Sequence, residues 1–251
     1  MKIKNILISQ PKPTATDKSP YTDIAKKYNI NVDFNPFVKV ERIEYKEFLQ
    51  SKIDIKSHNA FIFNSKIAID HFFHTCKEGK IEINNEWRYF CLSDAIAFYL
   101  QKHIIFRKRK IFFSEKQTIE DLMYYIKRYS NEKFLLVLSE VHKDDIPKAL
   151  EKANINYTKA IMFRTVSPDV LDLNVNKYEI FLFFSPPGIQ FFKEKFPDFV
   201  QGEKIFGTLG ANTAKTASEL GFRIDIKVPN AEFVSMANAL DNFLKIYTNF
   251  K

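Results

Sequence analysis

Glycine and cysteine are both scarce in this chain. Its 251 residues include 6 Gly and 2 Cys. So little glycine excludes a collagen-like repeat and a long glycine-rich linker, because both need glycine at high frequency. Two cysteines, Cys76 and Cys91, are too few for a disulfide framework, and they favour a protein of a reducing compartment.

Long apolar runs are missing as well. No stretch approaches the roughly 18 consecutive apolar residues that a membrane-spanning helix needs. The first residues, MKIKNILIS, lack the apolar core and the small-residue cleavage site of a secretory signal. We therefore expect a cytoplasmic protein that does not use a membrane.

Several motifs of nucleotide and ester chemistry do not occur. The sequence has no Gly-x-Gly-x-x-Gly, no Gly-x-x-x-x-Gly-Lys and no Gly-x-Ser-x-Gly, which argues against dinucleotide, nucleotide and hydrolase sites. His71, His74 and Cys76 have the residue types of a zinc site. No acidic ligand follows them at a suitable spacing, so we expect a histidine pair at the surface or the core edge, and no metal.

Positive charge, in contrast, is in excess. The formal net charge is +8 and the isoelectric point is about 9.2, which fits a nucleic acid, an acidic lipid or a small polyanion as the partner. The densest basic run, FRKRK at 106–110, favours a solvated loop or a strand edge. A nucleic-acid-binding protein is a rival interpretation, although no standard nucleic-acid-binding motif is present; we expect no nucleic acid partner.

The chain repeats itself in four ordered pairs of segments. NILISQP (5–11) matches FLLVLSE (134–140), and NAFIFNSKIAIDHFF (59–73) matches YEIFLFFSPPGIQFF (178–192). RYFCLSDAIAFYL (88–100) matches IFGTLGANTAKTASEL (205–220), and TIEDLMYYI (118–126) matches AEFVSMANAL (231–240). Each half alternates short apolar runs with helical stripes, which predicts two α/β domains with parallel sheets flanked by helices.

The predicted elements follow from apolar runs and helical periodicity. Strands are expected at 5–9, 59–63, 88–92, 110–113, 134–138, 178–184, 205–209 and 222–228. Helices are expected at 19–28, 45–52, 66–77, 95–103, 118–129, 144–153, 187–196, 213–220 and 231–248. Two extended segments, 31–43 and 156–168, fall at matching points of the halves, and we interpret them as linkers that pair side by side.

The segment FLFFSPPGIQFF (181–192) predicts a binding corner. An apolar strand gives way to a helix at Ser185, where the hydroxyl can cap the helix and Pro186 fits the first turn. Gly188 lets a ligand approach the backbone. Because the first N–H groups of a helix lack partners, such a corner suits an anion.

The same construction recurs three more times. It is present at Asn64-Ser65, at Ser93-Asp94 and at Gly210-Ala211-Asn212-Thr213, so that each half carries two corners. Ligands of parallel α/β sheets bind outside the carboxyl ends of the strands. Ordinary helix capping explains any one corner, but their recurrence predicts a cleft that binds a ligand with several carboxylates or phosphates.

The chain resembles the uroporphyrinogen-III synthase family over nearly its whole length. FFSPPGIQFF is similar to the family's Phe-(Thr/Ser)-Ser-Pro segment, and LGANTAKTASELGF to its Gly-x-Thr-Thr-Ala…Leu-Gly pattern. MFRTV (162–166) stands where the family usually reads Val-Tyr-x-Thr, and FIFNSKIAI (61–69) looks like the corresponding segment of the other domain.

The resemblance implies a HemD-like fold of two α/β domains joined by a two-stranded β ladder. The domains would be 1–35 with 170–251, and 42–158, and the linkers would be 36–41 and 159–169. It also implies a cofactor-free lyase of haem biosynthesis that acts as a monomer. That lyase cyclises the linear tetrapyrrole hydroxymethylbilane with loss of water and inversion of ring D.

The resemblance also assigns site residues. Thr213 matches the second Thr of the family motif and is the expected catalytic residue, while Asn212 replaces the first. The other expected substrate contacts are Ser65, Ser93, Ser185, Pro186, Gly188, Gly210, Asn212 and Phe163. Phe163 stands at the family's tyrosine and cannot donate a proton, which keeps a second interpretation open: a non-enzymatic two-lobed binder of an anionic ligand, or an inactive paralogue.

Overall fold

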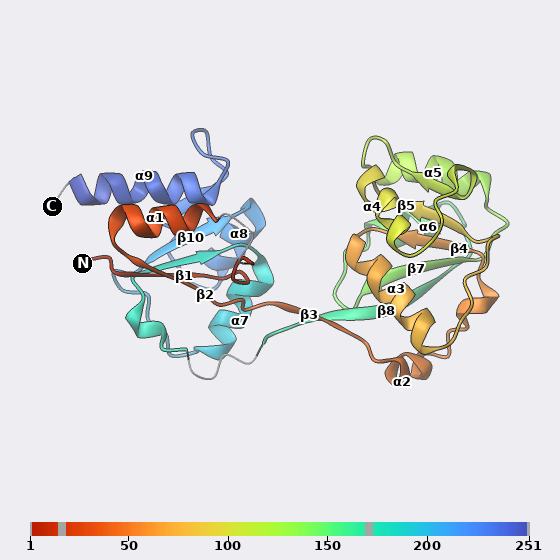
Figure 1. Ribbon diagram of the computed structural model, residues 1–251, viewed down its shortest axis with the longest axis horizontal. Coiled ribbons are helices and arrows are strands. Elements are labelled where there is room, and N and C mark those ends of the chain that lie inside the picture. The colour runs from red at the N-terminus through yellow and green to blue at the C-terminus, as the bar shows by residue number, and fades with distance from the viewer. Residues whose placement is uncertain (1, 15–18, 169–172, 250–251) are drawn as a thin grey trace. The chain divides into compact units, whose positions relative to one another are not determined.

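The chain folds into two compact units. The computed structural model describes residues 2–14, 19–168 and 173–249 (Figure 1). Unit 1 consists of Met1–Lys39 with Val166–Lys251, and unit 2 of Val40–Thr165. The chain therefore passes twice between the units, once near Lys39 and once near Val166. Among the described residues, no helix has the length and hydropathy to cross a bilayer.

Unit 1 is built on a parallel sheet of order β11-β10-β9-β1-β2. Its strands are β1 (Asn5–Ile8), β2 (Asn31–Phe34), β9 (Ile180–Phe183), β10 (Ile205–Leu209) and β11 (Ile226–Val228). One face carries α1 (Pro20–Tyr28) and α9 (Met236–Asn249), and the other carries α7 (Pro186–Lys195), α8 (Ala211–Glu219) and the 3-10 helix Val175–Lys177. In Figure 1, α1 and α9 run above these strands and α7 lies below them.

Unit 2 is built on a sheet of order β3-β8-β7-β4-β5-β6. Its strands are β3 (Lys39–Arg42), β4 (Ala60–Phe63), β5 (Arg88–Cys91), β6 (Ile111–Phe113), β7 (Phe134–Ser139) and β8 (Tyr157–Val166). One face carries α2 (Tyr45–Phe48), α3 (Lys66–Glu78) and α4 (Asp94–Tyr99), and the other carries α5 (Ile119–Arg128) and α6 (Asp145–Lys152). Short 3-10 helices occur at Leu49–Ser51, Ile55–Ser57, Leu100–Lys102 and Lys108–Lys110.

The central strands are buried on both faces, as parallel strands between helices must be. All four residues of β4 and all four of β9 are buried. Phenylalanine fills much of the space between sheet and helices: Phe192 of α7 lies within about 5 to 6 Å of the rings of Phe181, Phe183 and Phe206. The sequence contains 26 Phe, and these ring contacts show that phenylalanine side chains pack against one another in the core.

The internal repeat is confirmed by the topology. The strand order β2-β1-β9-β10-β11 of unit 1 corresponds to β8-β7-β4-β5-β6 of unit 2. The matched segments are thus equivalent: β1 with β7, β9-α7 with β4-α3, and β10-α8 with β5-α4. In both sheets the chain order reverses at one point, between β1 and β9 in unit 1 and between β7 and β4 in unit 2.

Every predicted strand and helix is present, with shifts at the ends. The largest shift is at α9, which begins at Met236 and not at 231. The Asn230 side chain accepts hydrogen bonds from the N–H groups of Glu232 and Phe233, and this turn stops the helix from extending backwards.

The interpretation of the two extended segments as linkers is incomplete. β3 does pair with β8, as expected for side-by-side segments. However, β2 is an edge strand of unit 1 that pairs with β1, and β8 is a ten-residue strand that pairs with β7. The apolar residues Ala160 and Met162 are buried in unit 2, so β8 belongs to that core as well as to the connection.

Candidate active site

Each unit has a topological switch point, where parallel α/β sheets bind ligands. In unit 1 it lies between the carboxyl ends of β1 and β9, which are followed by Ser9 and Ser185. The Ser9 N–H donates to the carbonyl oxygen of Leu182 at 2.9 Å. A Cβ at Gly188 would lie 3.2 Å from Ser185 Oγ and 3.9 Å from Ser9 Oγ, so this glycine places the backbone of α7 beside both hydroxyls.

The prediction of free backbone donors is wrong at α7. Pro186 and Pro187 occupy the first two helical positions and have no N–H, and the N–H of Gly188 donates to Ser185 Oγ at 3.3 Å. The N–H of Ile189 donates to the carbonyl oxygen of Ser185. The amides of this first turn are therefore either lacking or used, and the remaining donor of the corner is the Ser185 hydroxyl.

The first turn of α8 has free amides. Gly210, with φ at +91°, precedes the helix and contributes no side-chain cap. Within the described part of the chain, nothing accepts a hydrogen bond from the N–H groups of Ala211, Asn212 and Thr213. Asn212 is exposed, while Thr213 is only 2% exposed and its hydroxyl has no partner among the described residues. Three free amides at the positive end of a nine-residue helix suit a carboxylate.

The corresponding corners of unit 2 differ from each other. Ser65 Oγ caps α3 by accepting from the Ala68 N–H at 3.1 Å, and no described residue accepts from the amides of Lys66 and Ile67. Ser93 caps α4 in the same way. At α4, however, the Asp94 carboxylate lies in the first turn and accepts from Ala95, so this corner already carries a negative charge and is the least suited to an anion.

Sequence reasoning missed two serines at the switch points, Ser9 and Ser139. The register of β7 against β8 shifts between Leu138 and Ser139, which places Ser139 opposite Phe163. Such a bulge re-aims side chains. The Ser139 hydroxyl is buried with no partner among the described residues. The available signal was the serine that directly follows the matched apolar runs NILI and FLLVL.

Phe163 is part of the unit 2 core. The residue is 7% exposed, and its ring stacks on the His71 imidazole with centroids 5.1 Å apart. Desolvation by the core lowers the pKa of His71. A substrate contact by Phe163 stays a prediction. Tyr157 does not replace the missing hydroxyl here, because it lies at the amino end of β8 and donates to Glu151 at 2.8 Å.

The histidines that resembled a zinc site have other partners. His74 contacts Glu78 at 3.1 Å and also Arg42, while Cys76 is buried and burial raises its thiol pKa to about 12. In the described ranges, no group of three or more His, Cys, Asp and Glu side chains could hold a metal ion.

The prediction of a solvated loop or a strand edge for residues 106–110 is confirmed in part, because the run leads into the edge strand β6 and Lys108 and Arg109 are exposed. Lys110 is 8% exposed, and its ammonium group lies 2.6 Å from the Glu86 carboxylate. Arg107 lines a cavity.

Comparisons with known proteins agree with this architecture. The family model described as uroporphyrinogen-III synthase HemD matches residues 19–238. A uroporphyrinogen-III synthetase from Helicobacter pylori superposes with a TM-score of 0.64 at 16% identity, covering 97% of this chain and 100% of that one. A mutant uroporphyrinogen III synthase from Thermus thermophilus gives a TM-score of 0.58 at 11% identity, covering 98% of this chain and 99% of that one.

Comparison with curated protein sequences finds no match. The two structural likenesses show a shared fold, and the family model spans most of the chain. The chain belongs to the uroporphyrinogen-III synthase HemD family, whose members are lyases of haem biosynthesis.

Proposed function

We propose that this chain cyclises hydroxymethylbilane to uroporphyrinogen III, with loss of water and inversion of ring D. Family membership supports the reaction, and the observation that carries the site is the first turn of α8. Its three free amides and the Gly210 backbone form a carboxylate-binding corner at the edge of the sheet where ligands of this architecture bind.

The corners have graded roles in the proposal. Ala211, Asn212 and Thr213 bind a substrate carboxylate through their amides, and Lys66 and Ile67 after Ser65 bind another. The Ser185 corner contributes a hydroxyl and a close backbone at Gly188. Ser93 contributes least, because the neighbouring Asp94 repels carboxylates. Hydrogen bonds to a charged group are each worth about 1.5 to 3 kcal/mol, so the α8 corner dominates.

The chemistry asks for positioning and one proton donor. The electron-rich terminal pyrrole expels its hydroxyl group, which leaves as water once protonated, and the resulting azafulvene is attacked by ring D at its substituted α-carbon. The spiro intermediate then breaks the bond between ring D and the methylene bridge to ring C, which becomes a second azafulvene. The free α-carbon of ring D attacks this methylene and loses its proton, which inverts ring D. Holding the two ends together supplies roughly 7 to 11 kcal/mol at best. A positioned donor adds about 10² to 10⁴-fold, and the unpartnered Thr213 hydroxyl serves this role.

We further propose that one copy of the chain is sufficient and that it works in the cytoplasm without nucleic acid. Each unit contributes its own set of corners, so a second copy adds no missing element. The two cysteines are free and buried, as suits a reducing compartment. A molar mass from light scattering that matches a dimer would overturn the monomer.

The test is the identity of the product. Freshly generated hydroxymethylbilane closes without help to the uninverted isomer, so the protein is added and the isomers are separated by chromatography after oxidation. The expected result is the inverted isomer. Exclusive formation of the uninverted isomer would support the non-enzymatic binder or inactive paralogue, an alternative that Phe163 favours.

A pair of variants on α8 locates the activity. Thr213→Ala removes the proposed donor and should lower kcat about 10² to 10⁴-fold, with a smaller change in KM. Ser218→Ala is the matched control, because Ser218 is an exposed residue near the other end of the same helix. Equal activity of the two variants would remove Thr213 from the mechanism.

A further inference from the structure

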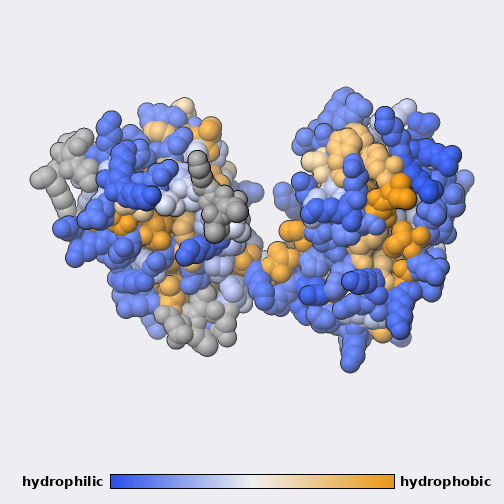
Figure 2. Space-filling view, viewed as in Figure 1, coloured by the Kyte–Doolittle hydropathy of each residue, from blue (hydrophilic) through white to orange (hydrophobic). Residues whose placement is uncertain are grey.

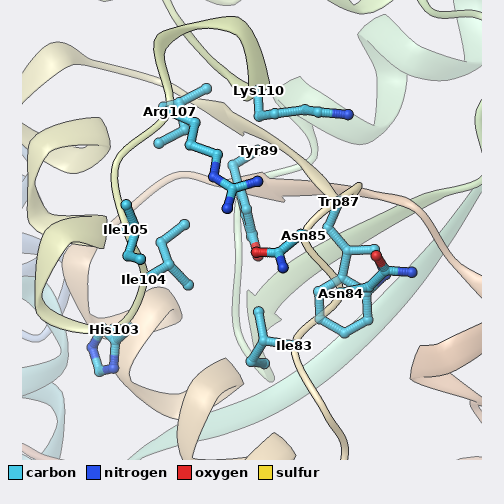
Figure 3. Close-up of a pocket in the computed structure, with 11 residues that line it drawn as sticks. Ile83, Asn84, Asn85, Trp87, Tyr89, His103, Ile104, Ile105, Arg107 and Lys110 are labelled. Carbon is cyan, nitrogen blue, oxygen red and sulfur yellow. The ribbon is translucent and has the colours of Figure 1, made fainter.

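Unit 2 contains a cavity at the amino ends of its strands, opposite the carboxyl ends that are followed by Ser65 and Ser93. The cavity has a volume of about 180 Å³ and lies between residues 83–89 and 103–111, where β5 and β6 begin (Figure 3). Ser65 and Ser93 follow the carboxyl ends of β4 and β5. The cavity is therefore separate from the candidate active site, and nothing in the proposed reaction uses it.

Its walls combine apolar and aromatic side chains with polar and charged ones, including Asn84, Asn85 and Arg107. Trp87, Ile104 and Ile111 line it, and the Trp87 ring is held in place against Phe61 with centroids 4.5 Å apart. Ile105 at the lining is 80% exposed, and Figure 2 shows apolar side chains gathered on part of the surface of unit 2. An apolar cavity of roughly 150 Å³ accommodates one benzene ring, so this cavity has room for a single aromatic ring.

A buried hydroxyl of a residue in the cavity wall lacks a partner. Tyr89 is 3% exposed, and its hydroxyl oxygen makes no hydrogen bond within the described residues. Burial raises the pKa of this phenol, so the group is neutral at physiological pH and can both donate and accept. Because buried polar groups are nearly always paired, the free hydroxyl points to a ligand that supplies a polar atom.

A cation completes the cavity. Arg107 lines it from the segment before β6, and in Figure 3 the Arg107 and Tyr89 side chains both extend in among the lining residues. The guanidinium makes no ion pair or hydrogen bond with any described residue. The other cation, Lys110, is already paired with Glu86. Arg107 is thus the group that is open to an acidic ligand, and its fork suits a carboxylate.

A wider hollow adjoins the cavity. It has a volume of about 700 Å³, shares Ile83, Asn84, Asn85 and Trp87 with the cavity, and adds Lys56, Lys80 and Glu82. It provides an open approach in which two lysines outnumber one glutamate, so the entrance also favours an anion over a cation.

We propose that this cavity binds a monocyclic aromatic carboxylate that carries a ring hydroxyl. The ring packs against Trp87 and Ile104, the hydroxyl pairs with Tyr89, and the carboxylate pairs with Arg107. Each of the three observations, an aromatic wall, an unpaired buried hydroxyl and an unpaired guanidinium, selects one part of that ligand.

The test uses 4-hydroxybenzoate, benzoate and 4-hydroxybenzyl alcohol as probes. Trp87 is the only tryptophan of the sequence, so its fluorescence reports on the cavity alone, and calorimetry gives the stoichiometry. We expect saturable one-to-one binding of 4-hydroxybenzoate, and about 2- to 10-fold weaker binding of benzoate, from the loss of one hydrogen bond. Absence of saturable binding of all three probes would overturn the proposal and indicate that water alone pairs with Tyr89.

Variants separate the contributions. Tyr89→Phe should abolish the preference for 4-hydroxybenzoate over benzoate, and Arg107→Gln should weaken both acids about 10-fold or more while leaving the alcohol unchanged. Arg109→Gln, an exposed arginine outside the cavity, is the matched control. Equal affinity of the two arginine variants for both acids would contradict the proposal. Binding does not require turnover, so Thr213→Ala must bind 4-hydroxybenzoate as the unsubstituted chain does, whatever the product assay shows.

Discussion

Replacement of Gly210 by alanine tests the α8 corner. This residue has φ at +91° and ψ at 143°, a region that residues with a Cβ avoid. Forcing alanine into it costs about 1 to 3 kcal/mol. There is little steric contribution, because the nearest atom to a Cβ built there is Thr213 Oγ1 at 3.8 Å. The backbone conformation is therefore what the substitution perturbs.

Gly202→Ala is the comparison. Gly202 also has positive φ, at +54°, with nothing near its Cβ position, but it lies in the left-handed helical region, where alanine costs roughly 1 to 2 kcal/mol. Urea denaturation of both variants measures the two free energies of unfolding. We expect Gly210→Ala to lower the free energy of unfolding more than Gly202→Ala does. We also expect it to lower the activity more than the loss of stability explains, because the direction of the Ala211 to Thr213 amides changes.

Two results would refute this reasoning. Equal stability of the two variants would mean that the Gly210 conformation is no more strained for alanine than the left-handed helical conformation of Gly202. A Gly210→Ala variant with unchanged KM for hydroxymethylbilane would mean that the α8 amides bind no substrate carboxylate. Since one charged hydrogen bond is worth about 1.5 to 3 kcal/mol, the expected rise in KM is roughly 10- to 100-fold.

Three further substitutions probe the same account. Ser139→Ala removes a buried unpaired hydroxyl, so we expect an unchanged or higher free energy of unfolding together with a lower turnover. A lower melting temperature would contradict the expectation for stability. Phe163→Tyr should destabilise unit 2 by about 1 to 3 kcal/mol, because the new hydroxyl enters the core, and a rise in turnover would contradict the burial. Burial lowers the pKa of His58, whose Nδ1 donates to the Asp54 carbonyl and whose Nε2 accepts from Thr158. As the pH falls, His58 is therefore protonated in the unfolded chain before it is protonated in the folded chain. The free energy of unfolding has its full value above about pH 6.5 and decreases below it. His58→Gln should reduce this pH dependence in denaturation curves measured from about pH 5 to 7.

The strands and helices could be predicted because their signals are local. Apolar runs such as AFIF and IFLF are bounded by serine caps, and the structure keeps these boundaries within a few residues. The four pairs of matched segments identify which strands and helices of the two halves are equivalent, and the equivalent strand order of the two sheets confirms this match. Such features depend on residues that are close in the sequence, so the sequence alone predicts them.

Donor availability could not be predicted in the same way. The four corners look alike in sequence, yet α7 lacks free amides and α4 has an acid in its first turn. The two prolines are visible in the sequence, but the use of the Gly188 N–H by Ser185 depends on cap geometry. The placement of Ser139 depends on the register shift of β7 against β8, and the cavity beside Tyr89 forms between two segments that are distant in the sequence. Neither feature can be predicted from a local sequence pattern.

Binding of substrate carboxylates by the α8 amides is tested most directly by NMR chemical-shift perturbation of the backbone amides with the product. Uniformly ¹⁵N-labelled protein would be titrated with uroporphyrin III, the oxidised form of the proposed product, and the backbone N–H resonances followed. We expect saturable shifts at Ala211, Asn212 and Thr213, with smaller ones at Lys66 and Ile67. Shifts confined to the opposite edges of the sheets, with those five amides unmoved, would contradict this expectation.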